Sequence, residues 1–385
     1  MSFFSNEAVN RLNLHSTVIA LAAGAGGIFI LVFLLRAGVS PPLVLCAMAA
    51  MVGGRFLLRP MVLPLARRIG LRRTLITGTV LEAAVFPLLP LVKGPDAVFL
   101  AVVLIGPVGS VLYWTCYHAY FASVGDDEHR GGQVGVRQAL TAVVSIVAPL
   151  VGAYALAFGG PWFAFLLAAA IQVAAAAPLI GAPEVAIPPE SPGGLKAAWP
   201  GMLLMACDGV FAGGYHYVWQ IALFASLGES FTAYGGAMAL AALVGAAFSL
   251  WIGRHIDAGR GRSAIAIALV VALAVLALRA GSVGTPWLAV TANALGALVE
   301  AVWIPALMAP IYNLAKAAPC PLTFNVATEG GWDVGCGVAC LAGAAIIAAG
   351  ATYAAPILIG LAGVLMAFSL LWRRYGRVQA EAGVG

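Results

Sequence analysis

Apolar runs of about twenty residues alternate with short polar segments along the whole sequence, and this alternation limits the fold more than any other feature. A hydropathy pass places twelve such runs near 16–35, 41–65, 74–92, 97–121, 134–157, 162–181, 200–226, 232–252, 263–281, 286–311, 331–349 and 353–372. An α-helix needs about 20 apolar residues to cross a bilayer, whereas the strands of a membrane barrel need about 10. The sequence therefore predicts an all-α membrane protein with twelve transmembrane helices.

The composition excludes a soluble or a disordered chain. Hydrophobic residues make up 62% of the 385 residues, charged residues make up 9%, and the mean hydropathy is +1.00. A soluble domain carries about 25% charged residues, and a disordered chain is poor in apolar ones. No disulfide framework is predicted, because the cysteines lie in apolar runs or in a segment expected in the cytoplasm: Cys46, Cys116, Cys207, Cys320, Cys336 and Cys340.

The basic residues are distributed unevenly between the two sides of the predicted membrane. If the N-terminus is cytoplasmic, fifteen Lys and Arg residues fall in inside segments, and only Arg36, Lys93 and Arg279 fall in outside segments. Basic residues concentrate on the cytoplasmic side of membrane proteins. We therefore expect a multi-pass protein of the inner (plasma) membrane with both termini in the cytoplasm.

A segment rich in proline and glycine lies between the sixth and seventh apolar runs. It is too polar to insert in a bilayer and is typical of a linker. The sequence thus predicts an N-terminal six-helix half at 1–181, a cytoplasmic linker at 182–196 and a C-terminal half with a short cytoplasmic tail at 197–385. Two six-helix repeats in pseudo-symmetric halves are a known transporter plan.

Two cytoplasmic loops and one helix carry patterns of a known family. In the loop 253–262, Asp257 follows Gly253 by four residues and lies beside Arg254 and further arginines. The corresponding first-half loop keeps Gly70, Arg72 and Arg73, although Arg67 stands where the pattern has Asp. Arg130, just before the fifth run, is followed within that run by Pro149-x-x-Gly152. The family pattern at this place has Gly at two positions where this chain has Ala.

Through these motifs nearly the whole chain resembles the major facilitator superfamily (MFS), without identifying a subfamily. The resemblance implies a monomeric secondary active transporter that works by alternating access and is not an enzyme. It implies no cofactor, and the sequence contains no glycine-rich phosphate loop. The arginine that many proton-coupled drug exporters carry in the fourth helix is missing from 98–113.

Among the ionisable residues inside predicted spans, five stand out: Arg55, Arg59, Glu82, Asp208 and Glu300. Each costs about 2.5 to 3.5 kcal/mol to insert and therefore needs a partner or a function. Arg55 and Arg59 share a helix face at i and i+4, where two guanidinium groups would attract an anionic solute. The alternative is that Arg55 pairs with Glu82 while Arg59 extends toward the cytoplasm.

Polar residues form a stripe on the tenth run. Asn293, Gly296, Glu300 and Trp303 follow helical spacing, and the resemblance implies that this helix lines a central cavity. A cavity carboxylate that binds and releases a proton can couple transport to a proton gradient. We expect this role for Glu300 or Asp208. The alternative is a static hydrogen bond or ion pair.

Aromatic and polar residues gather in the seventh and fourth runs. They comprise Tyr215, His216, Trp219 and Gln220 in the seventh, after a bend expected at Gly213 and Gly214, and Trp114 and His118 in the fourth. Aromatic rings with polar tips suit the wall of a site for an organic solute. With Arg55, Arg59, Asn293 and Trp303 they form the predicted substrate site. The alternative is an aromatic belt at the membrane surface.

We expect the residues that open and close the transport path to lie at the cytoplasmic ends of the helices. Beside the loop residues Arg254, Asp257 and Arg72, we expect Glu329 and Asp333 in the first turn of the eleventh helix, after a loop at 313–328. A helix N-terminus stabilises negative charge, and both acids could face Arg130 or Arg137 across the halves.

The functional prediction is a proton-coupled secondary transporter of a small organic solute, with an anion favoured. Its partners would be that solute, protons and the lipid bilayer, without nucleic acid. The alternatives are proton-antiport efflux of amphipathic compounds, transport of a metal or metal chelate, and a non-transporting receptor or assembly factor. No clustered ligand motif points to a metal site.

Overall fold

A computed structural model describes residues 6–124, 130–185, 187, 194–252, 261–319 and 321–382. Over these ranges the chain is helical and contains no strand. Each predicted apolar run corresponds to one helix or to a chain of helical pieces, so the prediction of twelve helical spans is confirmed. The helices extend beyond several of the predicted ends.

The chain divides into two compact units, each described here by itself. Unit 1 comprises Met1–Ser40, Ala50–Ser191 and Glu229–Ala239, and unit 2 comprises Pro41–Ala49, Pro192–Gly228 and Leu240–Gly385. The helices α3 (Pro41–Leu58) and α11 (Phe231–Ile252) each contribute to both units. The division into halves at 1–181 and 197–385 stays a prediction.

Unit 1 contains the helices of the first six predicted spans. Besides its parts of α3 and α11 they are α1 (Glu7–Ala25), η2 (Gly27–Phe29), α2 (Ile30–Arg36), η3 (Arg59–Met61), α4 (Val62–Ile69), α5 (Leu71–Ala83), η4 (Phe86–Leu91), α6 (Ala97–Val124), α7 (Arg130–Tyr154), η5 (Ala155–Gly159), α8 (Gly160–Ala174) and η6 (Ala177–Leu179). The segments η5 and η7 (below) are π-helical, and the other η segments are 3-10 helices.

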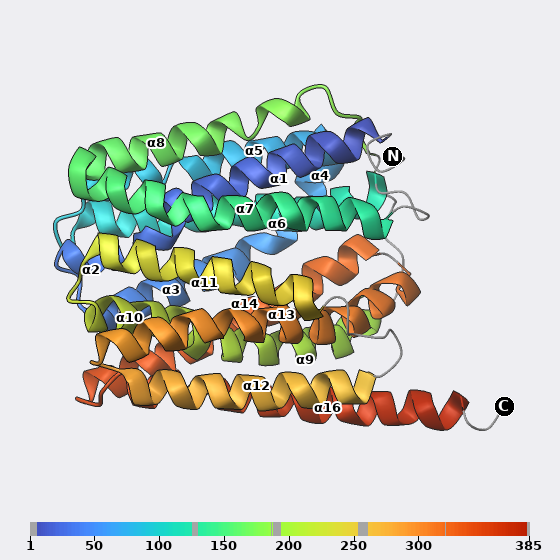
Figure 1. Ribbon diagram of the computed structural model, residues 1–385. Coiled ribbons are helices and arrows are strands. Elements are labelled where there is room, and N and C mark those ends of the chain that lie inside the picture. Colours follow the sequence, from blue (N-terminus) through green and yellow to red (C-terminus); the bar gives the residue numbers. More distant parts are fainter. Residues whose placement is uncertain are drawn as a thin grey trace. The chain divides into compact units, whose positions relative to one another are not determined.

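Unit 2 contains the helices of the last six predicted spans. Besides its parts of α3 and α11 they are α9 (Gly194–Ala212), η7 (Gly213–Val218), α10 (Trp219–Ser226), α12 (Gly261–Ser282), α13 (Pro286–Ala317), α14 (Pro321–Ala348), α15 (Ala354–Ile357) and α16 (Ile359–Ala382). Figure 1 shows α12 and α16 side by side within this unit.

By length and hydropathy alone, ten helical stretches of the described residues could cross a membrane. One of them, Ala139–Leu179, covers the fifth and sixth predicted spans together. The seventh predicted span, formed by α9, η7 and α10, is not among the ten. Its polar and aromatic residues explain its lower hydropathy, and they also make it the span of greatest functional interest.

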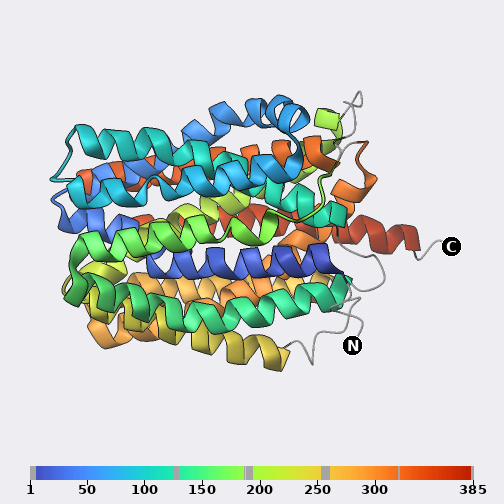
Figure 2. The ribbon, with the colours of Figure 1, turned by 90° about the horizontal axis from the view of Figure 1, so that it is seen from above.

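Small residues bring the helices of unit 1 into close contact. In Figure 2, α1 (blue) lies beside α7 (green). A Cβ at Gly152 of α7 would overlap the carbonyl of Ala25 in α1, and one at Gly24 would overlap the side chain of Ala148. Close approach of backbones at small residues is a general way to associate membrane helices. The Gly152 of the fifth-run pattern therefore has a packing role.

Glycines also fix the packing of α9 in unit 2. A Cβ at Gly331 or Gly335 of α14 would overlap the carbonyls of Met202 and Ala206 in α9, and one at Gly209 would overlap the carbonyl of Trp332. The two helices therefore touch backbone to backbone over several turns. This contact sets the position of every side chain that α14 directs toward α9.

Two local predictions were wrong. The segment 313–328 is mostly helical, because α13 continues to Ala317 and α14 begins at Pro321. Glu329 and Asp333 therefore lie about two and three turns inside α14, where a helix N-terminus no longer acts on them. Their expected position in a first turn is corrected.

The bend expected at Gly213 and Gly214 is a π-helical turn. The helix passes from α9 through η7 into α10 with helical backbone angles at both junctions. A Cβ at Gly213 would overlap the side chain of Ala339, and one at Gly214 would press on the carbonyl of Ile357. The glycines therefore allow neighbouring helices to approach. Single π-turns inside α-helices are frequent at functional sites.

Candidate functional site

The intramembrane charges of unit 1 have partners inside that unit. Arg59 is 2% exposed, and its Nη1 donates to Thr115 Oγ1 of α6 at 3.1 Å. Gln172 Nε2 of α8 donates to Glu82 Oε2 at 2.9 Å, and Arg55 acts electrostatically on the same carboxylate. Arg55 thus acts on Glu82, as in the alternative considered for it, whereas Arg59 is buried against α6. The predicted substrate-binding role of Arg55 and Arg59 stays a prediction.

The aromatic residues of α6 form a cluster in unit 1. The rings of Trp114 and His118 are stacked with centroids 6.0 Å apart, and Tyr117 lies against both of them. Trp114 is 40% exposed, and His118 is half-buried. The structure thus brings Trp114 and His118 together as predicted from their spacing.

In unit 2, the helical run α9–η7–α10 and the antiparallel α13 face each other along a row of polar contacts. Trp219 Nε1 donates to Asn293 Oδ1 at 3.0 Å, and Tyr215 Oη donates to the Gly296 carbonyl at 2.5 Å. Further along lie His216 with Glu300 and Asp208 with Trp303. We call this row the polar seam, defined by Asp208, Tyr215, His216, Trp219, Asn293, Gly296, Glu300 and Trp303. It unites most residues of the predicted substrate and proton sites.

Asp208 is held by two indole groups from different helices. Trp303 Nε1 of α13 donates to Asp208 Oδ1 at 2.7 Å, and Trp332 Nε1 of α14 donates to Oδ2 at 3.1 Å. Each carboxylate oxygen thus has a neutral donor, and Asp208 links α9, α13 and α14. Trp332 was not among the predicted site residues, because only the fold brings α14 against α9.

Replacing Trp303 by phenylalanine should destabilise the protein by about 1 to 2 kcal/mol, because a partly buried carboxylate loses a hydrogen-bond donor. Thermal unfolding in detergent measures the effect. Trp287→Phe, at a tryptophan that is 70% exposed, is the matched control and should leave the melting temperature unchanged. Equal melting temperatures for the Trp303→Phe variant and the native protein would show that this bond contributes nothing.

Exposure separates the seam into a buried and an accessible part. Tyr215, Trp219, Trp303 and Asn293 are at most 5% exposed. The side chains of His216 and Glu300 are 41% and 52% exposed, with His216 Nδ1 4.0 Å from Glu300 Oε1. Asp208 and Gln220 are half-buried. The aromatic residues therefore form the buried part of the polar seam. Its accessible groups are mainly the ionisable side chains of His216, Glu300 and Asp208. Their binding roles stay predictions.

Arg279 of α12 belongs to this site and was missed. It is 4% exposed, and its Nη1 donates to the Tyr215 carbonyl at 2.6 Å. The guanidinium carbon lies 3.9 Å from the ring centroid of Tyr215 and 4.9 Å from that of Trp219. The expectation that Arg279 lies in an outside segment is wrong. Its position inside the apolar run 263–281 was the available signal.

A loop contact in unit 1 involves the predicted gating residue Arg72. Glu184 Oε1 accepts from the Arg72 backbone N–H at 2.7 Å, and Arg72 Nη1 donates to the carbonyls of Ile180 and Ala182 at 2.8 and 2.6 Å. Gly70 has a φ of +94°, and a Cβ there would overlap the Glu184 carboxylate. Glu184 thus supplies the acid that this loop lacks at Arg67, and it was missed because it lies in the predicted linker.

Among the described residues, the structure does not bring the remaining predicted gating residues together. Arg254 and Asp257 lie outside the described residues, and so do the side chains of Arg130 and Arg137. In α14, Glu329 is half-buried and Asp333 is 1% exposed. Their gating roles stay predictions.

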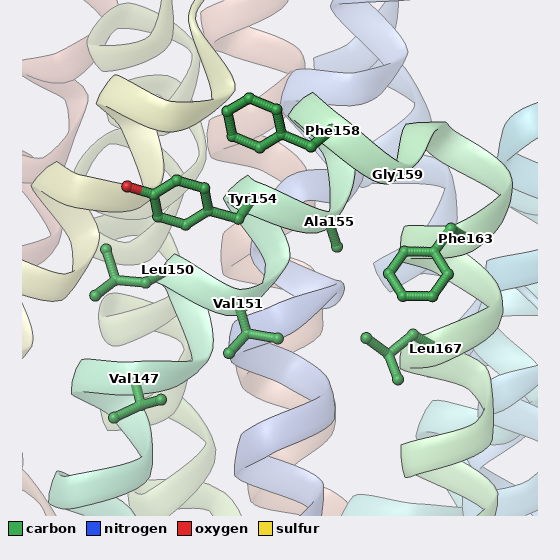
Figure 3. Close-up of a pocket in the computed structure, with 9 residues that line it drawn as sticks. All are labelled: Val147, Leu150, Val151, Tyr154, Ala155, Phe158, Gly159, Phe163 and Leu167. Carbon is green, nitrogen blue, oxygen red and sulfur yellow. The ribbon is translucent and has the colours of Figure 1, made fainter.

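A cavity of about 640 Å³ lies in unit 1 between α7, η5 and α8. None of its lining residues belongs to the polar seam. Figure 3 shows its lining side chains, which are apolar except for the Tyr154 hydroxyl. Phe158 and Phe163, which line it, are 80% and 56% exposed, as expected of residues that face lipid. The cavity carries no charged group and does not resemble a site for a polar solute.

The described residues contain no cluster of three or more His, Cys, Asp or Glu side chains that could hold a metal ion. None of the five cysteines in this part of the chain is joined in a disulfide. Cys320 lies outside this part of the chain.

No family model and no curated protein matches the sequence. Solved structures do match. The nucleoside transporter NupG, in a mutant form, is 16% identical and covers 94% of this chain and 98% of its own, with a TM-score of 0.65. A D-xylose-proton symporter is 16% identical over 96% of both chains, with a TM-score of 0.66. Identities this low establish the fold alone. The protein is a multi-pass membrane protein with the fold of the major facilitator superfamily.

Proposed function

We propose that the chain is a secondary active transporter of the MFS that moves a small polar organic solute by alternating access, coupled to protons. The fold supports this proposal, because the similar structures are a nucleoside transporter and a proton symporter and not enzymes. The proposal includes a monomer in the inner membrane with both termini in the cytoplasm, and gating at its cytoplasmic loops.

The observation that carries the proposal is the half-exposed His216–Glu300 pair in the middle of two spans. A carboxylate at such a depth is costly, and a protein that only served as a scaffold would have no reason to keep it. An imidazole and a carboxylate 4.0 Å apart can hold a proton between them. Asp208 is the second candidate, but both of its oxygens already accept indole hydrogen bonds.

The solute class follows from the accessible groups of each unit. In unit 2 they are acids, an imidazole and an amide, while Arg279 is buried. In unit 1 Arg59 donates to Thr115 and Arg55 acts electrostatically on Glu82. We propose that Arg55 also attracts an anionic solute. Hydrogen-bonding groups beside aromatic rings also suit a neutral hydroxylated solute, as in the nucleoside and xylose transporters. Organic anions and neutral hydroxylated solutes are therefore the two classes to test.

A thermal-shift screen of the purified protein should find a stabilising solute. A ligand at 100 times its Kd stabilises the folded state by about 2.7 kcal/mol. The screen would compare organic anions, sugars, nucleosides, amino acids, lipophilic cations and metal ions at about pH 5.5 and 7.5. Uptake of the best solute into proteoliposomes should rise with an imposed pH gradient.

The Arg55→Gln variant separates the two classes. It should abolish stabilisation by an organic anion and leave stabilisation by a neutral solute unchanged. If no solute stabilises the protein and none is taken up, the transporter proposal fails in favour of a receptor or assembly factor. Stabilisation by lipophilic cations or by metals alone would redirect it to efflux or to metal transport.

A further inference from the structure

Three arginines lie where two neighbouring spans of unit 2 reach the same surface of the membrane. The stretches of α12 and α16 that are long and apolar enough to cross a membrane are Arg262–Ser282 and Ala354–Arg374. The two helices lie side by side (Figure 1), and they bring Arg262 close to Arg373 and Arg374. The distribution of basic residues predicts that this surface is the cytoplasmic one.

The guanidinium group of Arg262 lies over an aromatic ring of the other helix. Its central carbon is 5.0 Å from the ring centroid of Trp372, and the ring of Phe368 lies 5.3 Å from that of Trp372. A ring face attracts a cation but does not neutralise its charge. Arg262 Nε has no hydrogen-bond partner in the described part of the chain. The ring contact thus positions the charge and leaves it able to bind an anion.

The three arginines lack a counter-anion in the structure as described. None of them forms an ion pair with a described carboxylate. The helix α12 contains no acid, and the nearest acid of α16 in sequence, Glu381, follows Arg374 by about two helical turns. Because α16 continues to Ala382, its free C-terminal carbonyls also lie further along the helix. Their charge is therefore left for a ligand from outside the chain.

We call this surface the arginine patch, defined by Arg262, Trp372, Arg373 and Arg374. Trp372 is 39% exposed, Arg373 is exposed, and the other two arginines are half-buried. The patch is therefore accessible from outside the protein.

An apolar face continues from the arginine patch along the membrane-spanning part of α16. Trp372, Phe368 and Leu365 follow helical spacing and share one face of the helix. Leu365 is 48% exposed, as expected of a residue that faces lipid. A ligand on this surface would meet cations at one end and an apolar helix face at the other. Such a surface fits an amphipathic anion better than a free inorganic one.

We propose that the arginine patch binds the phosphate group of an anionic phospholipid, whose acyl chains lie along the apolar face of α16. A guanidinium group offers a planar fork of donors that matches phosphate oxygens. Basic clusters directly beyond a membrane span attract anionic lipids, and indole groups are favoured at the depth of the head groups. A zwitterionic lipid should bind less well, because its own cation would lie near the arginines. The inference goes beyond transport and does not depend on it.

The orientation of the protein in the membrane does not by itself explain the arginine patch. The charge rule requires basic residues on one side of the membrane, but it sets no partner for any of them. It does not require Arg262 to lie over an indole group of another helix. A role in orientation alone would therefore give no selectivity among lipids, which makes the two explanations separable.

Native mass spectrometry of the full-length protein in detergent tests the proposal. The protein would be titrated with phosphatidylglycerol and with phosphatidylcholine of identical acyl chains. The native protein should retain phosphatidylglycerol at a concentration about tenfold lower than phosphatidylcholine. The double variant Arg373→Gln/Arg374→Gln should lose this preference. Arg262→Gln should weaken the preference, and Arg262→Lys, which keeps the charge, should retain most of it.

Arg68→Gln/Arg73→Gln is the matched control. It removes the same charge from two exposed arginines of unit 1 and should keep the preference for phosphatidylglycerol. An equal loss in the two double variants would overturn the proposal, because the attraction would then follow net charge. The absence of any preference in the native protein would overturn it too. If the double variant of α16 does not fold, Arg262→Gln decides, and an unchanged preference there rejects the site.

Two further measurements locate the lipid and exclude a free phosphate. Phosphatidylglycerol with brominated acyl chains should quench more tryptophan emission in the native protein than in Trp372→Phe. Equal quenching would place the lipid elsewhere and reject the site. Millimolar inorganic phosphate or glycerol phosphate should not displace the lipid, since neither has an acyl chain to lie on α16. Displacement by either would mean that the arginine patch binds a soluble phosphate instead.

Discussion

Proteoliposomes containing the Glu300→Gln variant should lose proton-driven accumulation of the solute by at least tenfold. Glutamine has nearly the size and shape of glutamate but cannot take up and release a proton, so the pH gradient loses its point of action. Binding and exchange of solute across the membrane without a gradient should persist, because alternating access itself does not require the proton. Counterflow and gradient-driven uptake of the solute found in the thermal-shift screen measure the two activities separately.

Glu229→Gln is the matched control for this experiment. Its side chain is 52% exposed, as is that of Glu300, but it pairs with Arg36 at the surface of unit 1. It should accumulate solute at the native rate. Asp208→Asn tests the second candidate, and we expect a smaller loss because both oxygens of Asp208 already accept indole hydrogen bonds. Undiminished accumulation in both Glu300→Gln and Asp208→Asn would refute the proton site.

The Gly335→Val variant should be the least stable of the single substitutions considered, losing about 3 kcal/mol or more. A Cβ at this position would overlap the backbone carbonyl of Ala206, and backbone atoms cannot move aside as a flexible side chain can. The α9–α14 contact would have to open, which would also pull Trp332 away from Asp208. The fraction of monodisperse protein that survives heating in detergent measures the loss.

Gly281→Val provides the comparison for helix propensity. Gly281 also lies in a helix of unit 2, and a Cβ there meets nothing within 4 Å. Both substitutions introduce the same β-branched residue, so only the overlap with Ala206 distinguishes them. A melting temperature of Gly335→Val equal to that of Gly281→Val would mean that the two helices are not in backbone contact.

The twelve spans could be predicted because their length and hydropathy are properties of consecutive residues. The errors arose where polar residues continue a helix that packs against another. In α14, the turns around Thr328 contain Thr, Asn and Glu and resemble a loop, yet Gly201 of α9 lies directly against Phe324 and Thr328. Burial of that face by α9 stabilises the helix in a way that hydropathy does not register.

Half of the polar seam followed from helical spacing. Asn293, Gly296 and Glu300 had to share one face of their helix, and the structure places α9–η7–α10 against that face. The contact of Trp332 with Asp208 could not be predicted, because it joins helices far apart in the sequence. For Arg279, the place inside an apolar run was visible in the sequence, but its contacts with Tyr215 and Trp219 were not. Counting Arg279 as an outside charge also concealed it, since the charge rule uses the number of basic residues and not their depth.

The π-helical turn η7 has a mechanical consequence for the residues on it. Such a turn holds one more residue than an α-helical turn, so it can shift along the helix by one position without breaking the helix at either end. Each residue that it passes rotates by about 100° about the helix axis. If the π-turn moved by one residue at Tyr215 and His216, one of these side chains would rotate out of the row that faces α13. Its neighbour would rotate into that row.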